Sequence, residues 1–179
     1  MPELILPDPR VQSSFLTAVK EFQAEGRGVA SDHSMLGREI SQWGDRLEDP
    51  AGFAEYTDWV RADALEGSSR PPGFVPATSL WWVDGREYLG RLTIRHRLTP
   101  SLLTLGGHIG YDIRPSGRRR GHATAMLAAA LPVAHGLTID PALITCDEDN
   151  VGSRKVIEAN GGVLEDVREG KLRFWTPTS

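Results

Sequence analysis

Four arginines in one short segment offer the clearest capacity for chemistry in this sequence. Arg114, Arg118, Arg119 and Arg120 lie within seven residues, directly before Gly121. A strand is expected before this turn and a helix after it. The first N–H groups of a helix have no internal partners, and the helix dipole adds partial positive charge there. Arginines add charge-assisted hydrogen bonds, and a glycine lets a bulky anion approach the backbone. The segment therefore predicts a phosphate or pyrophosphate site.

The spacing of these residues does not identify the anion. A Walker loop requires G-x-x-x-x-G-K-[ST], and the dinucleotide fingerprint requires G-x-G-x-x-G. Neither pattern occurs in the sequence. A solvated arginine-rich loop is the alternative explanation for an arginine run that stands alone. The residues by themselves indicate a small-anion site and leave its ligand open.

Composition places the chain among globular proteins of one domain. It has 179 residues, of which 40% are hydrophobic and 25% charged, and a formal net charge of −4. This length suits one domain with a sizeable core, and the apolar fraction excludes a disordered chain. A nucleic-acid partner is not expected, because the sequence has no overall basic character. The single cysteine, Cys146, excludes an internal disulfide and a CxxC site.

Signals for membrane insertion and export are missing from the sequence. No apolar run approaches the ~18 residues of a membrane span, and no basic and then apolar segment follows Met1. We therefore expect a cytoplasmic chain without a membrane partner. The first 60 residues hold 5 basic and 11 acidic side chains, which is a weak indication that cationic substrates are attracted.

Helical and alternating patterns give the order of the elements around the arginine segment. Apolar residues at helical spacing predict helices over 11–26, 50–66 and 122–136, and another from Asn150 to Gly161. Runs typical of strands cover 79–83, 88–95, 107–113, 142–146, 163–167 and 172–175, with a hairpin turn at Asp84-Gly85. The expected fold class is α/β (α+β), with a mixed central sheet of about six to seven strands flanked by helices.

The arginine segment and its surroundings resemble one protein superfamily. Arg118-Arg119-Arg120-Gly121-His122-Ala123 is similar to the R/Q-x-x-G-x-G/A motif of the GNAT N-acetyltransferases. Residues 107–115 resemble the fourth strand of that superfamily, and residues 150–162 resemble its following helix, so the resemblance spans roughly residues 78–176. It implies a single N-acetyltransferase domain over residues 1–179. Residues 1–77 would form a helical acceptor-side part, and residues 78–179 a coenzyme-binding core.

The resemblance implies acetyl-coenzyme A as the co-substrate and assigns residues to it. The pyrophosphate would lie on backbone N–H groups of the motif, which are those of Arg118, Arg119, Arg120, Gly121, His122 and Ala123. The pantetheine arm would follow Tyr111, Asp112 and Ile113 like an added strand, and Asn150 and Ser153 would also reach the coenzyme. Arg119 stands where many relatives have glycine, so the pyrophosphate contact requires that Arg119 adopt no positive φ.

Acetyl transfer to an amine needs a base for the ammonium proton and a donor for the developing oxyanion. His108 is the first candidate base, since the resemblance places it where several superfamily members carry a catalytic Glu. Its alternative role is a hydrogen bond within the sheet. Glu148 is the second candidate, and a backbone N–H within residues 110–112 is the expected oxyanion donor. Ile157 aligns with the usual acidic tyrosine and cannot donate a proton.

The expected function is that of an N-acetyltransferase, which moves an acetyl group directly from acetyl-coenzyme A to a primary amine. The acceptor would be a small molecule or a peptide, no metal would take part, and the resemblance suggests a homodimer. A non-catalytic acyl-coenzyme A-binding regulatory module is the alternative, supported by Ile157 and the unsettled base. A nucleotide-phosphate binder is a third hypothesis. A calcium-loop pattern over residues 147–158 is rejected, because Lys155 would stand beside the metal.

Overall fold

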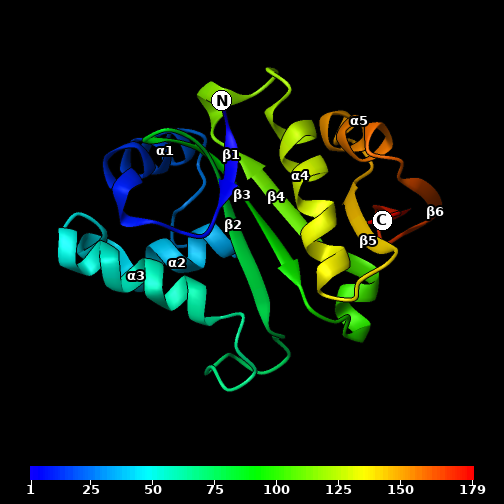
Figure 1. Ribbon diagram of the computed structural model, residues 1–179, viewed down its shortest axis with the longest axis horizontal. Helices are drawn as coiled ribbons and strands as arrows, with labels where there is room; N and C mark the ends of the chain where they lie inside the picture. The colour runs from blue at the N-terminus through cyan, green and yellow to red at the C-terminus, as the bar shows by residue number, and fades with distance from the viewer.

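Seven strands form one mixed sheet in the order β1-β2-β3-β4-β5-β7-β6 (Figure 1). The computed structural model describes residues 1–179. The strands are β1 (Glu3–Ile5), β2 (Ala77–Asp84), β3 (Glu87–Arg95), β4 (Ile109–Ile113), β5 (Ala142–Asp147), β6 (Val163–Arg168) and β7 (Lys171–Thr176). The α-helices are α1 (Gln12–Ala24), α2 (Met35–Trp43), α3 (Pro50–Ala62), α4 (His122–Gly136) and α5 (Val151–Ala159). Shorter helical turns are η1 (Pro9–Val11), η2 (Gly44–Leu47), the π-helical η3 (Leu102–Gly106) and η4 (Pro115–Gly117).

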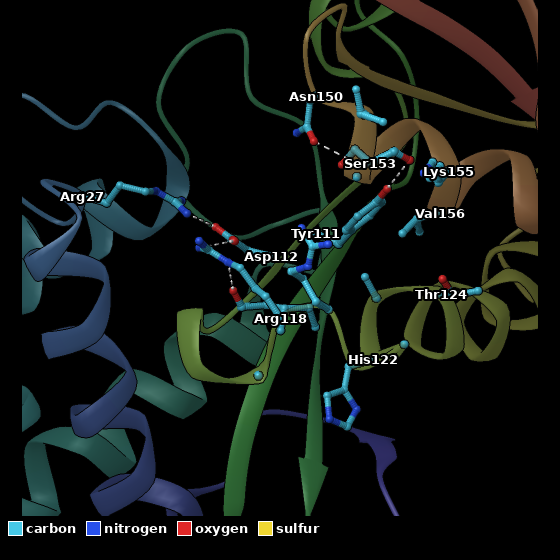
Figure 2. A pocket seen from close by; sticks show the side chains of 17 residues that line it. Arg27, Tyr111, Asp112, Arg118, His122, Thr124, Asn150, Ser153, Lys155 and Val156 are labelled. Atoms are coloured by element: carbon cyan, nitrogen blue, oxygen red, sulfur yellow. Dashed lines mark hydrogen bonds and ion pairs between the residues drawn. The ribbon is translucent and has the colours of Figure 1, made fainter.

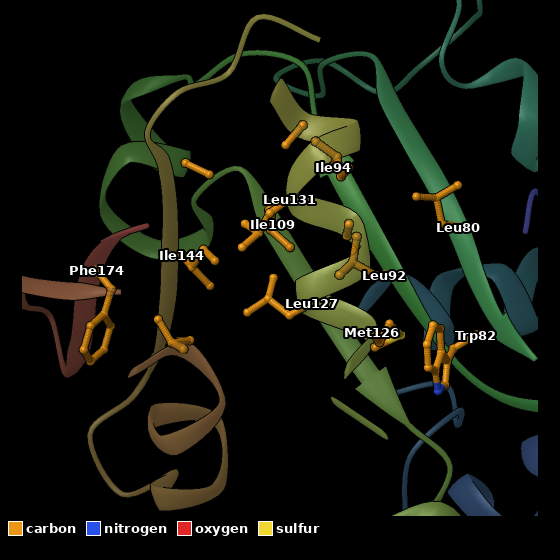
Figure 3. Packing of buried hydrophobic residues seen from close by; sticks show 14 of the residues in the cluster. Leu80, Trp82, Leu92, Ile94, Ile109, Met126, Leu127, Leu131, Ile144 and Phe174 are labelled. Carbon is orange, nitrogen blue, oxygen red and sulfur yellow. The ribbon is translucent and has the colours of Figure 1, made fainter. Parts of the chain in front are cut away.

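Helices cover the two faces of the sheet, and each face has its own hydrophobic core. In Figure 1, α1, α2 and α3 lie on one side of the sheet, and α4 lies on the other. Trp81 and Trp82 point to opposite faces because side chains alternate along a strand. Trp81 packs with Phe15 and Tyr56 in one cluster, whereas Trp82 belongs to the cluster beneath α4 that Figure 3 shows. The sheet therefore separates two differently lined spaces.

Capping side chains begin the helices that border these spaces. Ser34, Asp49 and Asn150 precede α2, α3 and α5, and each accepts a hydrogen bond from the backbone N–H three residues later, at 3.2, 2.8 and 3.0 Å. Such caps satisfy N–H groups that have no partner inside the helix. The start of α4 is different, because Gly121 precedes it and no side chain caps it.

β4 and β5 are parallel neighbours that separate after one contact. Their register contains only the pair Ile109 and Ile144, whereas β3 and β4 pair along the whole of β4. The Arg95 N–H donates to the His108 carbonyl, and the Arg114 N–H donates to the Leu89 carbonyl. Bonded residues alternate along an antiparallel pair, so residues 110, 112 and 114 face β3 with their backbone groups, whereas at His108 only the carbonyl does, because its N–H donates to the Leu143 carbonyl of β5. The backbone groups of Tyr111 therefore face the gap towards β5.

The expected mixed sheet of about six to seven strands is confirmed. Besides the short turns η1, η2 and η4, three elements lie outside the sequence prediction: β1, α2 and η3. β1 has three residues and exists through its pairing with β2. α2 carries apolar side chains at Leu36, Ile40 and Trp43, which is helical spacing behind the capping Ser34, so this helix had a signal in the sequence that the prediction missed. The helix expected over 50–66 ends earlier, at Ala62. All the helices are too short or too polar to cross a bilayer.

Candidate functional site

A cavity of about 840 Å³ lies beside the end of β4, between it and the starts of α4 and α5 (Figure 2). We call it the large cavity. The structure brings most of the predicted coenzyme residues to its wall, namely Tyr111, Asp112, Ile113, Arg118, Arg119, Gly121, His122, Ala123, Asn150 and Ser153. Arg120 is exposed and lies outside this lining. Residues far apart in the sequence therefore meet around one space.

The start of α4 forms one end of the large cavity. Gly121 has a φ of 81°, a left-handed conformation that suits glycine. A Cβ atom at this position would meet nothing within 4 Å, so the backbone is open to a ligand. The first N–H groups of α4 and the helix dipole favour an anion here.

Arg119 also adopts a left-handed backbone, with a φ of 60°. The condition that Arg119 avoid a positive φ is therefore not met, but the residue adopts the left-handed conformation that a glycine would take there, so the backbone of the turn stays open to an anion. The tight turn between η4 and α4 imposes this conformation, which costs an L-amino acid roughly 1 kcal/mol. The Arg119 side chain is exposed, lines the large cavity and forms no ion pair with the protein. Its charge is thus available to an anion.

Two other arginines of the segment hold the turn against α1. Arg114 is buried, and its Nε donates to Glu21 at 3.0 Å. The Arg114 hydrogen bonds lower the pKa of Glu21 to about 2. Arg118 pairs with Glu25, with 3.0 Å between Nη2 and Oε2, and its Nε donates to the Ile113 carbonyl at 3.1 Å. The contacts of Arg114 and Arg118 therefore hold the turn in place.

Tyr111 crosses from β4 to α5 at the other end of the large cavity. Figure 2 shows its ring reaching Ser153, whose carbonyl accepts a hydrogen bond from the Tyr111 hydroxyl at 3.3 Å. Burial raises the pKa of Tyr111 to about 12, so the hydroxyl stays protonated near neutral pH. His122 turns its ring towards Trp82, and the indole Nε1 donates to its Nδ1 at 3.3 Å.

Asp112 is the only carboxylate that lines the large cavity. It forms an ion pair with Arg27, and an Arg118 nitrogen lies 4.0 Å from its other oxygen. Figure 2 shows both arginines pointing at this side chain. Burial raises the pKa of Asp112 even though Arg27 opposes the change. Asp112 is therefore a partly desolvated carboxylate held between two cations.

A second cavity, of about 280 Å³, lies on the α2 side of β4. We call it the small cavity. Arg27, Tyr111 and Asp112 line both cavities, so the two spaces adjoin there. The remaining lining comes from the start of α2 and from one face of β3 and β4: Ser34, Met35, Leu36, Arg91, Thr93, Arg95 and Gly110.

A buried ion pair supports the small cavity. Arg91 donates to both oxygens of Glu39, at 2.6 and 2.9 Å, and the Tyr56 hydroxyl donates to Glu39 at 2.7 Å. Burial alone would lower the pKa of Arg91, but Glu39 outweighs it and raises the pKa well above its ordinary value. The charges of this pair are satisfied by each other.

The two candidate bases from the sequence lie away from both cavities. The Nδ1 of His108 accepts a hydrogen bond from the Leu143 N–H at 2.9 Å, so the neutral ring carries its proton on Nε2. Burial, with Arg95 nearby, lowers the pKa of His108. This geometry matches the alternative of a histidine bonded within the sheet. Glu148 is exposed after β5, and Ile157 is fully buried in the core beneath α4.

Several lining residues had no signal in the sequence analysis. Thr124, Gly152 and Lys155 stand next to predicted residues, so a wider window around each motif would have included them. Arg27 lies more than eighty residues before Asp112, in the connection between α1 and α2. No local pattern connects Arg27 with the arginine segment.

Comparison with known families and structures adds to this geometry. A family model described as an acetyltransferase (GNAT) domain matches residues 26–163. No curated protein has a matching sequence.

Solved structures of low sequence identity share the fold. Mycobacterium smegmatis RimJ in complex with a coenzyme A disulfide is 19% identical, with a TM-score of 0.66, and the match covers 98% of this chain and 81% of that one. The microcin C7 self-immunity acetyltransferase MccE, with acetyl-coenzyme A and AMP, is 12% identical, with a TM-score of 0.64 over 98% and 92% of the chains. A Salmonella typhimurium acetyltransferase that modifies the N-terminal serine of ribosomal protein L7/L12 is 16% identical, with a TM-score of 0.54 over 97% and 92%.

Proposed function

Because the chain belongs to the GNAT acetyltransferase family, we propose that it transfers an acetyl group directly from acetyl-coenzyme A to a primary amine. One observation carries this proposal. In the large cavity, an uncapped helix N-terminus and the open edge of a strand border the same space. A pyrophosphate requires the first feature, and an extended amide-containing arm requires the second.

The coenzyme would lie along the large cavity from α4 to the gap beside β4. The backbone from Arg118 to Ala123 and the unpaired charge of Arg119 would hold the pyrophosphate. Tyr111 would offer its backbone groups to the pantetheine arm, since they face the gap. The Tyr111 N–H is also the donor that we propose for the thioester oxygen, within the range of residues expected from the sequence.

The amine acceptor would enter through the small cavity. This cavity adjoins the large one at Tyr111 and Asp112, so an amine there would approach the coenzyme from the opposite face of β4. Holding both reactants at one junction favours direct transfer, because it replaces an encounter in solution by a fixed orientation.

We propose Asp112 as the proton acceptor in place of His108 and Glu148. It is the only carboxylate that lines either cavity, and it lies where they adjoin. Burial raises the pKa of Asp112, which makes the carboxylate a stronger base, while the Arg27 ion pair keeps it charged.

The pair Asp112→Asn and His108→Gln tests this assignment. Asp112→Asn should lower kcat by about 100-fold with little change in coenzyme affinity, and should remove the acid limb of the pH–rate profile. His108→Gln keeps an acceptor for the Leu143 N–H and should change kcat little. A loss in His108→Gln as large as in Asp112→Asn would return the role to His108.

Thiol release tests the function itself. The purified chain is mixed with acetyl-coenzyme A and a panel of primary amines, and free coenzyme A is measured against samples that lack either protein or amine. Amine-dependent release supports an acetyltransferase. Coenzyme binding without release by any amine would instead favour the non-catalytic regulatory module.

Other expectations from the sequence stay predictions. They are the division into an acceptor-side part over residues 1–77 and a coenzyme-binding core over residues 78–179, a homodimer, a cytoplasmic location, and the absence of nucleic-acid, membrane and metal partners. The choice between a small-molecule and a peptide acceptor depends on the small cavity.

A further inference from the structure

Arg95, at the end of β3, presents a guanidinium group without a charged partner. It lines the small cavity and is half-buried. Its Nη1 donates to the carbonyls of Gly106 and Gly107, at 3.1 and 3.2 Å. Its Nη2 and Nε have no protein acceptor within hydrogen-bond distance, and no carboxylate lies within ion-pair distance of the group. The guanidinium is therefore fixed at one nitrogen and free at the others.

The charges around the small cavity do not balance without a ligand. Of its three arginines, Arg91 pairs with Glu39 and Arg27 pairs with Asp112. Arg95 has only backbone carbonyls, and burial lowers its pKa with no acidic group to oppose the change. An arginine keeps its proton in proteins, so the cavity holds one uncompensated positive charge. A partly buried charge of this kind favours an anionic partner.

The free guanidinium lies beside the junction of the two cavities. A Cβ atom on Gly110 would come within 3.7 Å of both Nη1 and Nη2 of Arg95, so the group lies over Gly110. Asp112 lies two residues after Gly110 and points to the same face of β4. By strand geometry these two positions are about 7 Å apart. The absence of a side chain on Gly110 leaves room between a cationic and an anionic group.

We propose that Arg95 binds a carboxylate of the acceptor, while the acceptor's amino group lies towards Asp112. The preferred acceptors are then amines that carry a carboxylate a few bonds away, such as an acidic amino acid or a peptide with an acidic N-terminal residue. This inference rests on the proposed function. At this site we therefore expect an acidic substrate. The acidic first third of the chain had instead indicated that cationic substrates are attracted.

Matched acceptors that differ only in charge test the carboxylate site. Steady-state transfer is compared for peptides headed by Glu or by Gln, and for free glutamate and glutamine α-amide, since free glutamine would keep an α-carboxylate that Arg95 could bind. The Glu-headed peptide or glutamate should have a KM about tenfold lower than its amide counterpart. The peptide pair and the free pair distinguish a peptide N-terminus from a free amino acid as the source of the carboxylate.

Variants of Arg95 show whether this side chain causes the preference. Arg95→Met should remove the difference between acid and amide, mainly through KM. Arg95→Lys keeps a charge without the forked geometry, should retain part of the preference, and serves if Arg95→Met fails to fold. Arg97→Met is the control, because Arg97 is exposed, pairs with Glu66 and lies outside the cavity, so it should leave the preference intact.

Equal KM values for acid and amide acceptors would overturn the inference, as would a preference that survives Arg95→Met. If no amine in the panel is turned over, calorimetric binding of the Glu-headed peptide to the coenzyme-loaded chain decides it. Binding that Arg95→Met abolishes supports the carboxylate site, and no binding overturns it. Failure of the proposed function is distinct, since it removes thiol release with every amine.

Discussion

The two cavities beside β4 are built in different ways. The large cavity depends on backbone geometry: an uncapped helix N-terminus, two left-handed residues before it, and a strand edge left open by the divergence from β5. The small cavity depends on side chains that meet across long stretches of sequence, such as Glu39 and Arg91, which are 52 residues apart. A local motif can therefore specify the first cavity, whereas the second depends on the complete fold.

Breaking the support of the small cavity should have the largest effect on stability. Glu39→Ala leaves the buried Arg91 without its carboxylate, which should lower the free energy of unfolding by about 3–5 kcal/mol. Urea unfolding followed by tryptophan fluorescence measures the change. Glu55→Ala is the control, because it removes an exposed partner of Arg46 and should cost no more than about 1 kcal/mol. Equal losses in the two variants would contradict a supporting role for the buried pair.

Breaking the large cavity should affect binding more than folding. Gly121→Glu places a carboxylate at the expected pyrophosphate site, so coenzyme affinity should fall at least about 100-fold, or roughly 2.7 kcal/mol. The space around Gly121 is open, and the left-handed backbone adds a strain of roughly 1 kcal/mol to the variant. Gly73→Glu, also at a left-handed glycine in open space but outside both cavities, is the matched control. Unchanged affinity in Gly121→Glu, measured by calorimetry, would refute the placement of the coenzyme.

The ion pair between Glu21 of α1 and Arg114 of the arginine segment should make the free energy of unfolding depend on pH. The pKa of Glu21 is lowered to about 2 in the folded chain by Arg114, so its contribution to stability is complete above its unfolded pKa, near 4.5. That contribution disappears as the pH falls towards 2. Glu21→Gln should therefore cost about 2 kcal/mol at pH 7 and little near pH 2. A deficit that stays constant with pH, in unfolding curves of both proteins, would show that Glu21 acts otherwise.

A substitution of Arg119 separates the effect of backbone strain on stability from the effect of the side-chain charge on coenzyme binding. Arg119→Gly relieves the left-handed strain, and after the entropy cost of glycine the chain should gain about 0.5 kcal/mol of stability. The same change removes a cation from the cavity, so coenzyme affinity should fall several-fold. Thermal unfolding and calorimetry measure the two quantities. A loss of both would mean that the Arg119 side chain also stabilises the turn.

The success of the sequence analysis follows this division between local and distant contacts. The strand, turn and helix from Ile109 to Gly136 have their signals within a few residues of each other, so the residues of this segment could be expected on one wall, and most of them line one cavity, whereas their role towards the coenzyme stays a prediction. Asn150 could be predicted as a helix cap for the same reason.

Features that depend on distant contacts escaped the sequence analysis. Arg27 reaches Asp112 only because the connection between α1 and α2 folds over β4. The place of His108 depends on its bond to Leu143 in a neighbouring strand. β1 owes its structure to pairing with β2, more than seventy residues later. No spacing rule within one segment contains this information.

Calorimetric titration of the unmodified chain with acetyl-coenzyme A, repeated in the presence of ATP, tests the central claim most directly. We predict one acetyl-coenzyme A bound per chain, and ATP at the same concentration should not displace it, because the pantetheine arm adds contacts along β4 that ATP cannot make. No heat of binding would contradict the coenzyme site. Equally tight binding of ATP would show that the large cavity recognises a nucleotide phosphate instead.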